Sequence, residues 1–161
     1  MTESKYIWMD GEFTPWNEAK VHVLSHTLHY GNGAIEGTKA YKTVDGRCAI
    51  FKLNEHTQRL LNSSKMTLMN VPFTLEELNK AQVELLQKNE LTNGAYIRPL
   101  VYLGYGVMGL YHKDAPVKVS ISAWEWGAYL GEEGLKKGVR VKISSFTRTP
   151  NTSGMGKAKS V

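Results

Sequence analysis

The sequence predicts an α+β domain in which an antiparallel sheet is backed by two helices. Three observations favour this class over a doubly wound α/β sheet. Strand-like segments gather at the start and at the end of residues 1–126, two helix-like segments stand together between them, and tight-turn dipeptides separate several neighbouring strands. Strands joined by tight turns pair antiparallel, which leaves the two helices to cover one face of the sheet.

Two Asp-Gly dipeptides predict two β-hairpins. The first, at residues 10–11, separates the apolar run 6–9 from Glu12 and Phe13. The second, at residues 45–46, separates the runs 34–41 and 48–52. Asp-Gly readily adopts the positive φ angles that tight hairpins need, so we expect a sheet that begins at the N-terminus.

Two amphipathic helices are predicted after the second hairpin. The first opens at Asn54, a residue type that favours the N-cap, and repeats its apolar residues at helical spacing from Leu60 to Leu68. It should end before Pro72. The second begins with Thr74 and Glu77, whose spacing is that of a capping box. Both helices should pack their apolar faces on the sheet.

Three further strands are predicted at 95–103, 117–126 and 139–145, because these segments are rich in β-branched and aromatic residues. Glycines interrupt the pattern between the last two strands.

The same pattern predicts the domain organisation. Residues 1–126 form a small α+β domain, residues 127–138 a linker, and residues 139–161 the truncated start of a second, larger domain. This last segment is far shorter than the roughly 50 residues that a domain needs, so we expect the chain to be incomplete at its C-terminus.

Composition and charge exclude several classes of protein. The hydrophobic fraction is 42% and the charged fraction 22%, as in an ordinary globular domain, and no run approaches the ~18 apolar residues of a membrane span. The net charge of +5 is not collected on one helix, which argues against nucleic-acid binding. The single cysteine, Cys48, and the lack of a signal-peptide pattern predict a cytoplasmic protein.

Two motifs resemble binding sites but lack essential parts. His26 and His29 have the separation of a metal pair, but no third ligand follows at zinc-like spacing, so we expect no metal. The glycine-rich residues 31–37 lack the G-x-G-x-x-G spacing and the following helix of a dinucleotide site.

Arg98 is the most informative single residue, because it lies inside an apolar strand, where alternation places it on the same face as Tyr96. A buried arginine needs an anion, and either a structural carboxylate or a substrate carboxylate would serve. The aromatic residues between 124 and 131 suit an apolar pocket or ordinary core packing. Arg59, beside the apolar stripe of the first helix, is uninformative by itself.

Five segments resemble the N-terminal half of the branched-chain amino-acid aminotransferases, which have the class IV (fold type IV) pyridoxal-phosphate fold. In chain order they are SHTLHYGNGAIEG, EHTQRL, AYIRPLVYLG, WGAYLG and PNTSGMGKAKS. The D-amino-acid aminotransferases and aminodeoxychorismate lyases share this fold, but AYIRPL and WGAYLG favour the branched-chain group.

The resemblance implies that the cofactor is pyridoxal 5′-phosphate. It makes Lys159 the catalytic lysine that forms the Schiff base, with Lys157 as a bystander, and Arg59 a ligand of the cofactor phosphate. A lysine amine at this place forms the bond to the cofactor and then moves a proton, while the pyridinium ring stores electrons.

The resemblance also implies the substrate-binding residues. Tyr96 would bind the α-carboxylate, and Arg98 the distal carboxylate of glutamate. Trp126 and Tyr129 would wall the branched side chain, and Tyr30 would reach into the site of a neighbouring subunit in a homodimer or higher homo-oligomer.

The implied reaction transfers an amino group between a branched-chain L-amino acid (leucine, isoleucine or valine) and 2-oxoglutarate, as in branched-chain amino-acid biosynthesis. The acid that pairs with the ring nitrogen in this family lies outside the 161 residues, so we expect the chain alone to be inactive. Ile35 replaces a frequent aromatic residue, which predicts a different pocket shape. The alternatives are a D-amino-acid aminotransferase or lyase of the same fold, and a non-catalytic dimerisation fragment.

Overall fold

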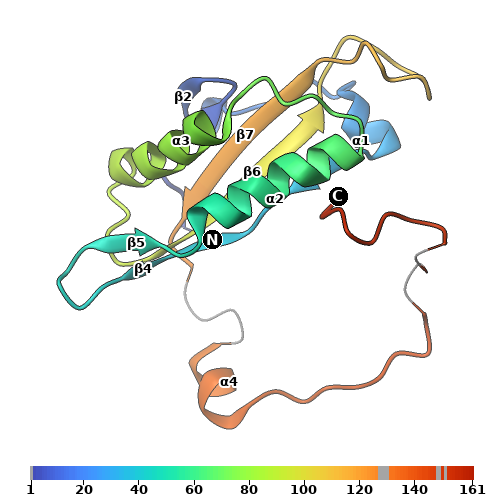
Figure 1. The fold of residues 1–161 in the computed structure, drawn as a ribbon. Coiled ribbons are helices and arrows are strands. Elements are labelled where there is room, and N and C mark those ends of the chain that lie inside the picture. The colour runs from blue at the N-terminus through green and yellow to red at the C-terminus, as the bar shows by residue number, and fades with distance from the viewer. Residues whose placement is uncertain (1, 127–130, 148–149, 151) are drawn as a thin grey trace.

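One antiparallel sheet forms the body of the protein in a computed structural model that describes residues 2–126, 131–147, 150 and 152–161 (Figure 1). The strands are β1 (Tyr6–Met9), β2 (Glu12–Pro15), β3 (Gly33–Ile35), β4 (Thr38–Lys42), β5 (Cys48–Ile50), β6 (Ala95–Leu103) and β7 (Val117–Trp124). Their order across the sheet is β2-β1-β7-β6-β4-β5, and β3 also pairs with β6. Every pairing between these strands is antiparallel, which confirms the predicted fold class.

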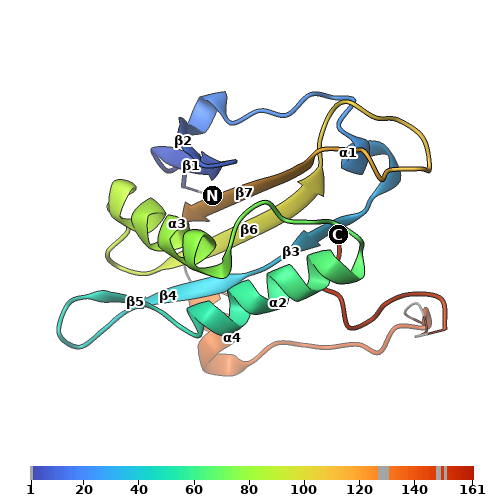
Figure 2. The same ribbon diagram turned by 45° about the horizontal axis from the view of Figure 1, so that its top comes forward.

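The two long helices lie on one face of this sheet. They are α2 (Leu53–Met66) and α3 (Leu75–Lys88), and the shorter elements are η1 (Trp16–Glu18), a 3-10 turn, α1 (His26–Tyr30) and α4 (Gly131–Lys137). Figure 2 shows both helices in front of the sheet, with α3 beside β1 and β7 and α2 beside β3 and β6, whereas α4 belongs to a segment that loops away from the sheet.

Alternation along β6 divides its side chains between the two faces. Ile97 and Val101 are fully buried under the helices, together with Ile121 of β7. The intervening residues, among them Tyr96 and Arg98, are partly exposed on the opposite face, which we call the open face. The core therefore fills one side of the sheet, and the open face carries the partly exposed side chains of Tyr96 and Arg98.

Both predicted hairpins are confirmed. Asp10 and Gly11 have φ angles of 49° and 105° between β1 and β2. Gly46 has a φ of 83° in the loop between β4 and β5, and this loop is closed by the Thr43 N–H, which donates to the Arg47 carbonyl at 2.8 Å.

The capping box of α3 is also confirmed. The Glu77 N–H donates to Thr74 Oγ1 at 3.2 Å, and the Thr74 N–H donates to Glu77 Oε2 at 2.7 Å. These two bonds satisfy backbone donors that the first turn of a helix leaves unpaired.

Helix α2 ends before Pro72 as predicted, but its predicted N-cap and the predicted place of Leu68 on its apolar face were wrong. The N-cap is Lys52, with a φ of 53°, and Asn54 lies inside the first turn, where its Oδ1 accepts from Asn79 Nδ2 at 2.6 Å. The helix ends at Met66, and Leu68 follows it with a φ of 59° and 80% exposure. The Met69 N–H bonds back to the Ser64 carbonyl at 2.9 Å, so Leu68 occupies the left-handed position of a Schellman motif instead of the apolar face.

Other expectations need correction. The run 34–41 is two strands, β3 and β4, broken at Glu36–Gly37, and both strands pair with β6. The strand predicted to reach residue 126 ends at Trp124. Residues 139–145 form no strand, because no described segment pairs with them, and the alternating residues Val141 and Ile143 are 91% and 95% exposed. Helix α4 lies within residues 127–138, and the predicted division into domains stays a prediction.

The last residues return to the body of the protein, and the C-terminus lies beside α2 (Figures 1 and 2). Ser160 forms an antiparallel bridge with Ala34 of β3. The segment therefore joins β3 on the edge that β6 does not occupy. No helix among the described residues has both the length and the apolar character to cross a membrane.

Candidate active site

The first part of the site is a buried carboxylate beneath α2. Glu36 has no exposed surface, although it lies in the short link between β3 and β4. Arg59 of α2 donates to it through Nε and through Nη2, the latter at 2.8 Å to Oε2. His56 Nδ1, one helical turn earlier, lies 2.8 Å from Oε2. A carboxylate only accepts, so this imidazole nitrogen carries the hydrogen.

The electrostatics of Glu36 explain why a buried acid is tolerated. Burial by itself raises the pKa of this carboxyl, but the hydrogen bonds from Arg59 and His56, the Arg59 charge and the Gly37 N–H together lower it below 4.5. The hydrogen bond to Glu36 in turn raises the pKa of Arg59. Glu36 is therefore an anion paired with a permanent cation.

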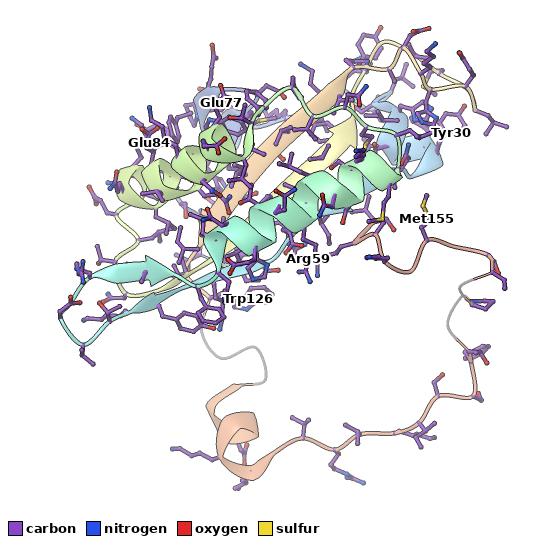
Figure 3. The ribbon with its side chains drawn as sticks, viewed as in Figure 1. Tyr30, Arg59, Glu77, Glu84, Trp126 and Met155 are labelled. Carbon is purple, nitrogen blue, oxygen red and sulfur yellow. The ribbon has the colours of Figure 1, made fainter. Side chains whose placement is uncertain are left out.

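The guanidinium of Arg59 remains available to a ligand on one edge. Its side chain is 51% exposed, and Nη1 makes no hydrogen bond to any described residue. A planar guanidinium with free N–H groups matches the oxygens of a phosphate. Arg59 thus fits the role of a phosphate ligand, and Figure 3 shows its side chain extending from α2 away from the helix axis.

Lys159 is bonded to Ser63, which lies one helical turn after Arg59 on α2. The Lys159 N–H donates to Ser63 Oγ at 3.0 Å, and Ser63 follows Arg59 by four residues, so both lie on one side of α2. The Ile35 N–H donates to the Lys159 carbonyl at 2.9 Å. The backbone of Lys159 is therefore fixed between α2 and β3, while the residue itself is exposed.

Gly33 leaves room for the Val161 side chain at this edge of the sheet. A Cβ at this position would lie 2.5 Å from Val161 Cγ2 and 3.0 Å from the Val101 carbonyl oxygen. A side chain at Gly33 would therefore displace the Val161 side chain and press on the backbone of β6.

The second part of the site is an aromatic and cationic group on the open face. Arg98 Nη2 donates to the Tyr96 hydroxyl at 2.8 Å. The rings of Tyr96 and Trp126 meet edge to face with centroids 4.8 Å apart, and Trp124 lies 5.2 Å from Tyr96. These rings form an apolar wall beside a cation.

Arg98 has no carboxylate within ion-pair distance among the described residues, and its Nε is buried without a hydrogen-bond partner in that part of the chain. Of the two alternatives left open by the sequence, this favours an external anion over a structural partner.

Gly37 connects the two parts. A Cβ on Gly37 would lie 2.2 Å from the Tyr96 hydroxyl oxygen, so the glycine leaves the space in which that hydroxyl lies. Glu36, its neighbour, holds Arg59. The link between β3 and β4 therefore touches both the Arg59 group and the Tyr96 group.

The remaining predicted residues fall elsewhere. Tyr30 stacks on His26 with ring centroids 4.6 Å apart, at the Leu103 end of β6, far along the sheet from Trp126 (Figure 3). Tyr129 lies outside the described residues. Lys157 is exposed in the turn before Lys159.

The two histidines with the separation of a metal pair bond to carbonyls instead. His26 Nε2 lies 2.8 Å from the Gly109 carbonyl oxygen, and His29 Nε2 lies 2.9 Å from that of Val23. Each imidazole ring thus forms a hydrogen bond with the backbone of a loop.

Sequence reasoning missed Glu36, His56 and Ser63. His56 and Ser63 precede and follow Arg59 by three and four residues, which is the spacing of one helix face, and this signal was available. Glu36 gave a weaker signal, because a lone acid between an apolar residue and a glycine is typical of a turn.

Comparison with known proteins identifies the family of this chain. A model of the amino-transferase class IV family matches residues 33–161. The branched-chain-amino-acid aminotransferase of Pseudomonas aeruginosa is 47% identical over 154 residues, which cover 96% of this chain and 50% of that protein. The enzyme of the same name from Escherichia coli K12 is 43% identical over 160 residues, with 94% and 50% covered.

Solved structures give the same result. The branched-chain aminotransferase of Escherichia coli superposes with a TM-score of 0.89 at 41% identity, over 98% of this chain and 52% of that one. The T.th. branched-chain aminotransferase with pyridoxamine 5′-phosphate gives 0.91 at 45%, over 99% and 52%. Another structure of the T.th. protein, complexed with N-(5′-phosphopyridoxyl)-L-glutamate, gives 0.88 at 40%, over 99% and 51%.

The chain spans about half the length of the relatives that it matches. Within that half, the family model covers most of the chain, from the start of β3 to the last residue. This chain belongs to the class IV aminotransferase family and is similar to its branched-chain-amino-acid aminotransferases.

Proposed function

We propose that the protein containing this chain is a pyridoxal-phosphate-dependent transaminase that moves an amino group between a branched-chain L-amino acid and 2-oxoglutarate. The observation that carries the proposal is the pair of bonds that fix Lys159 beside Arg59: Lys159 N–H to Ser63 Oγ, and Ile35 N–H to the Lys159 carbonyl. A lysine and a phosphate ligand are thereby held one helical turn apart.

The residues of this chain would share the work as follows. Arg59 binds the cofactor phosphate through its free edge, and the Lys159 amine holds the cofactor and then moves the proton that leaves the substrate Cα. Pyridoxal phosphate, when bound, supplies the electron sink. Arg59 is also paired with the buried Glu36.

Substrate recognition is assigned to the open face. Tyr96 binds the substrate α-carboxylate, and Arg98 binds the second carboxylate that glutamate and 2-oxoglutarate carry. Trp126 and Tyr129 wall the aliphatic side chain of leucine, isoleucine or valine. One pocket can accept both substrate types because a cation stands beside an apolar wall. The glutamate adduct bound by the T.th. relative supports this assignment.

We also propose that the protein acts as a homodimer or higher homo-oligomer. Apolar side chains lie exposed around α1 and on the loop after β6, and the two segments touch through the rings of His22 and Tyr105, 4.1 Å apart. The exposed residues are Val21, Val23, Leu24, Leu28, Tyr30, Tyr105, Met108, Leu110 and Tyr111. A patch of this kind marks an interaction site, and a second copy there would bring Tyr30 towards its partner's site.

Labelling and turnover test the proposed reaction. Borohydride treatment of the full-length protein with bound cofactor should fix the label on Lys159, and Lys159→Ala should abolish it whereas Lys157→Ala should not. L-Leucine with 2-oxoglutarate should turn over, and D-alanine should not. The 161-residue chain alone should bind the cofactor weakly and show no turnover, because it spans only about half the length of the relatives that it matches. A label on Lys157, or turnover of D-alanine in preference to L-leucine, would contradict the assignment.

A further inference from the structure

We propose that Glu36 is a positioning residue for the cofactor phosphate, because it fixes the orientation of the Arg59 guanidinium. The inference rests on the proposed role of Arg59 as the phosphate ligand. Glu36 would thus preorganise Arg59 for the phosphate without contacting the cofactor itself.

The bonding pattern carries the argument. Nε and Nη2 of Arg59 bond to the two different oxygens of Glu36, Oε1 and Oε2. This two-point contact fixes the plane of the guanidinium as well as its position, and it leaves Nη1 at the outer edge. An arginine that is half exposed would otherwise sample several rotamers, and a phosphate would have to select one of them.

Glu36 is itself held too firmly to follow Arg59. His56 Nδ1 lies 2.8 Å from Oε2, and the Gly37 N–H donates to the same oxygen at 3.3 Å. The residue is fully buried, and the Glu36 N–H donates to the Pro99 carbonyl of β6 at 2.9 Å. The carboxylate is thus anchored to the sheet. Through it, Arg59 on α2 is bonded to the same sheet that binds the Lys159 carbonyl.

A simple electrostatic role predicts the opposite result from a positioning role. The negative charge of Glu36 offsets the positive charge of Arg59. If charge were decisive, removing the Glu36 charge would strengthen the attraction of Arg59 for a phosphate. If orientation is decisive, the same removal weakens phosphate binding. The sign of the change therefore separates the two explanations.

The experiment compares two ligands on the full-length apoenzyme. Pyridoxal phosphate and pyridoxal, which lacks the phosphate, are titrated by absorbance against wild type and Glu36→Gln. We expect Glu36→Gln to weaken the binding of pyridoxal phosphate about 10- to 100-fold, which corresponds to the loss of one charge-assisted hydrogen bond. The affinity for pyridoxal should not change. In an Arg59→Ala background, Glu36→Gln should have no further effect on either ligand.

The matched control is Glu84→Gln on α3. Glu84 also pairs with a cation, Lys80, at 3.8 Å, but it lies on another helix, apart from Arg59 (Figure 3). This variant should bind both ligands as the wild type does. If Glu36→Gln fails to fold, Glu36→Asp keeps the charge and shortens the reach, and it should also weaken only the phosphorylated ligand.

Three results would overturn the inference: tighter or unchanged binding of pyridoxal phosphate, equal weakening of both ligands, or an additive loss in the Arg59→Ala background. Failure of the proposed function would look different, because wild-type protein itself would then give no lysine-bound cofactor absorbance.

Discussion

Gly37→Ala should damage substrate binding through Tyr96. The new Cβ would lie 2.2 Å from the Tyr96 hydroxyl oxygen, whereas ordinary contact begins at 3.4 Å. The hydroxyl must therefore move by about 1 Å, because the backbone of the sheet fixes the position of the new Cβ. The φ angle of Gly37 is not positive, so alanine is acceptable to the backbone and the effect is purely steric.

The expected size of the effect follows from the contacts that the movement disrupts. Displacing the hydroxyl breaks the 2.8 Å bond from Arg98 Nη2, and a hydrogen bond to a charged group contributes about 1.5–3 kcal/mol. Overpacking adds about 1–3 kcal/mol of destabilisation. We expect kcat/KM for leucine and for glutamate to fall by about tenfold or more, with a lower free energy of unfolding in urea.

A double-mutant cycle tests the explanation. Tyr96→Phe removes the hydroxyl, and the nearest atom to the new Cβ then becomes the ring Cζ at 2.9 Å, which requires only a small shift. Gly37→Ala should therefore cost clearly less in the Tyr96→Phe background. Gly104→Ala, which meets Lys118 Cγ at 2.8 Å on the same sheet, is the control for overpacking away from Tyr96 and should leave KM unchanged. Strictly additive losses for Gly37→Ala and Tyr96→Phe would refute the argument.

Two further outcomes are expected of the full-length protein. Arg98→Ala should slow the glutamate half-reaction by an amount equivalent to about 2–5 kcal/mol and spare the leucine half-reaction, and equal losses in stopped-flow measurements would make Arg98 structural. The pKa of Glu36 is lower in the folded state than its ordinary 4.5, so its contribution to stability is present above that value and is lost as the pH falls through the lowered pKa. Urea unfolding below about pH 4.5 should therefore narrow the stability difference between wild type and Glu36→Gln, and a difference independent of pH in that range would contradict the ion pair.

Local patterns predicted the elements whose cause is local. The Asp-Gly turns and the Thr74–Glu77 capping box were correct because each depends on residues close together in the sequence. Leu68 was wrongly assigned to the apolar face of α2, because the residue in the left-handed position after this helix is a leucine rather than a glycine. The prediction of a strand at 139–145 was wrong, because an alternating segment forms a strand only when it has a pairing partner, and none exists among the described residues.

The site was predictable only in part for the same reason. Arg98 and Tyr96 were placed on one face by alternation within β6, and the structure confirms that they meet. The proximity of Arg59 to Lys159 depends on a segment 100 residues away returning to the edge of β3, about which no local pattern is informative. Only the resemblance to a family singled out those two residues.

The dipeptide Glu36–Gly37 explains how the Arg59 group and the Tyr96 group keep a fixed position relative to each other. Successive residues of an extended chain face opposite sides of a sheet, so Glu36 points under α2 while its neighbour faces Tyr96 on the open face. A one-residue slip of this link would present a carboxylate to the Tyr96 hydroxyl and leave Arg59 without its anchor. The bonds that fix the link on both sides, Glu36 N–H to the Pro99 carbonyl and Ile35 N–H to the Lys159 carbonyl, oppose such a slip. The same two bonds therefore set the spacing between the proposed cofactor lysine and the proposed substrate pocket.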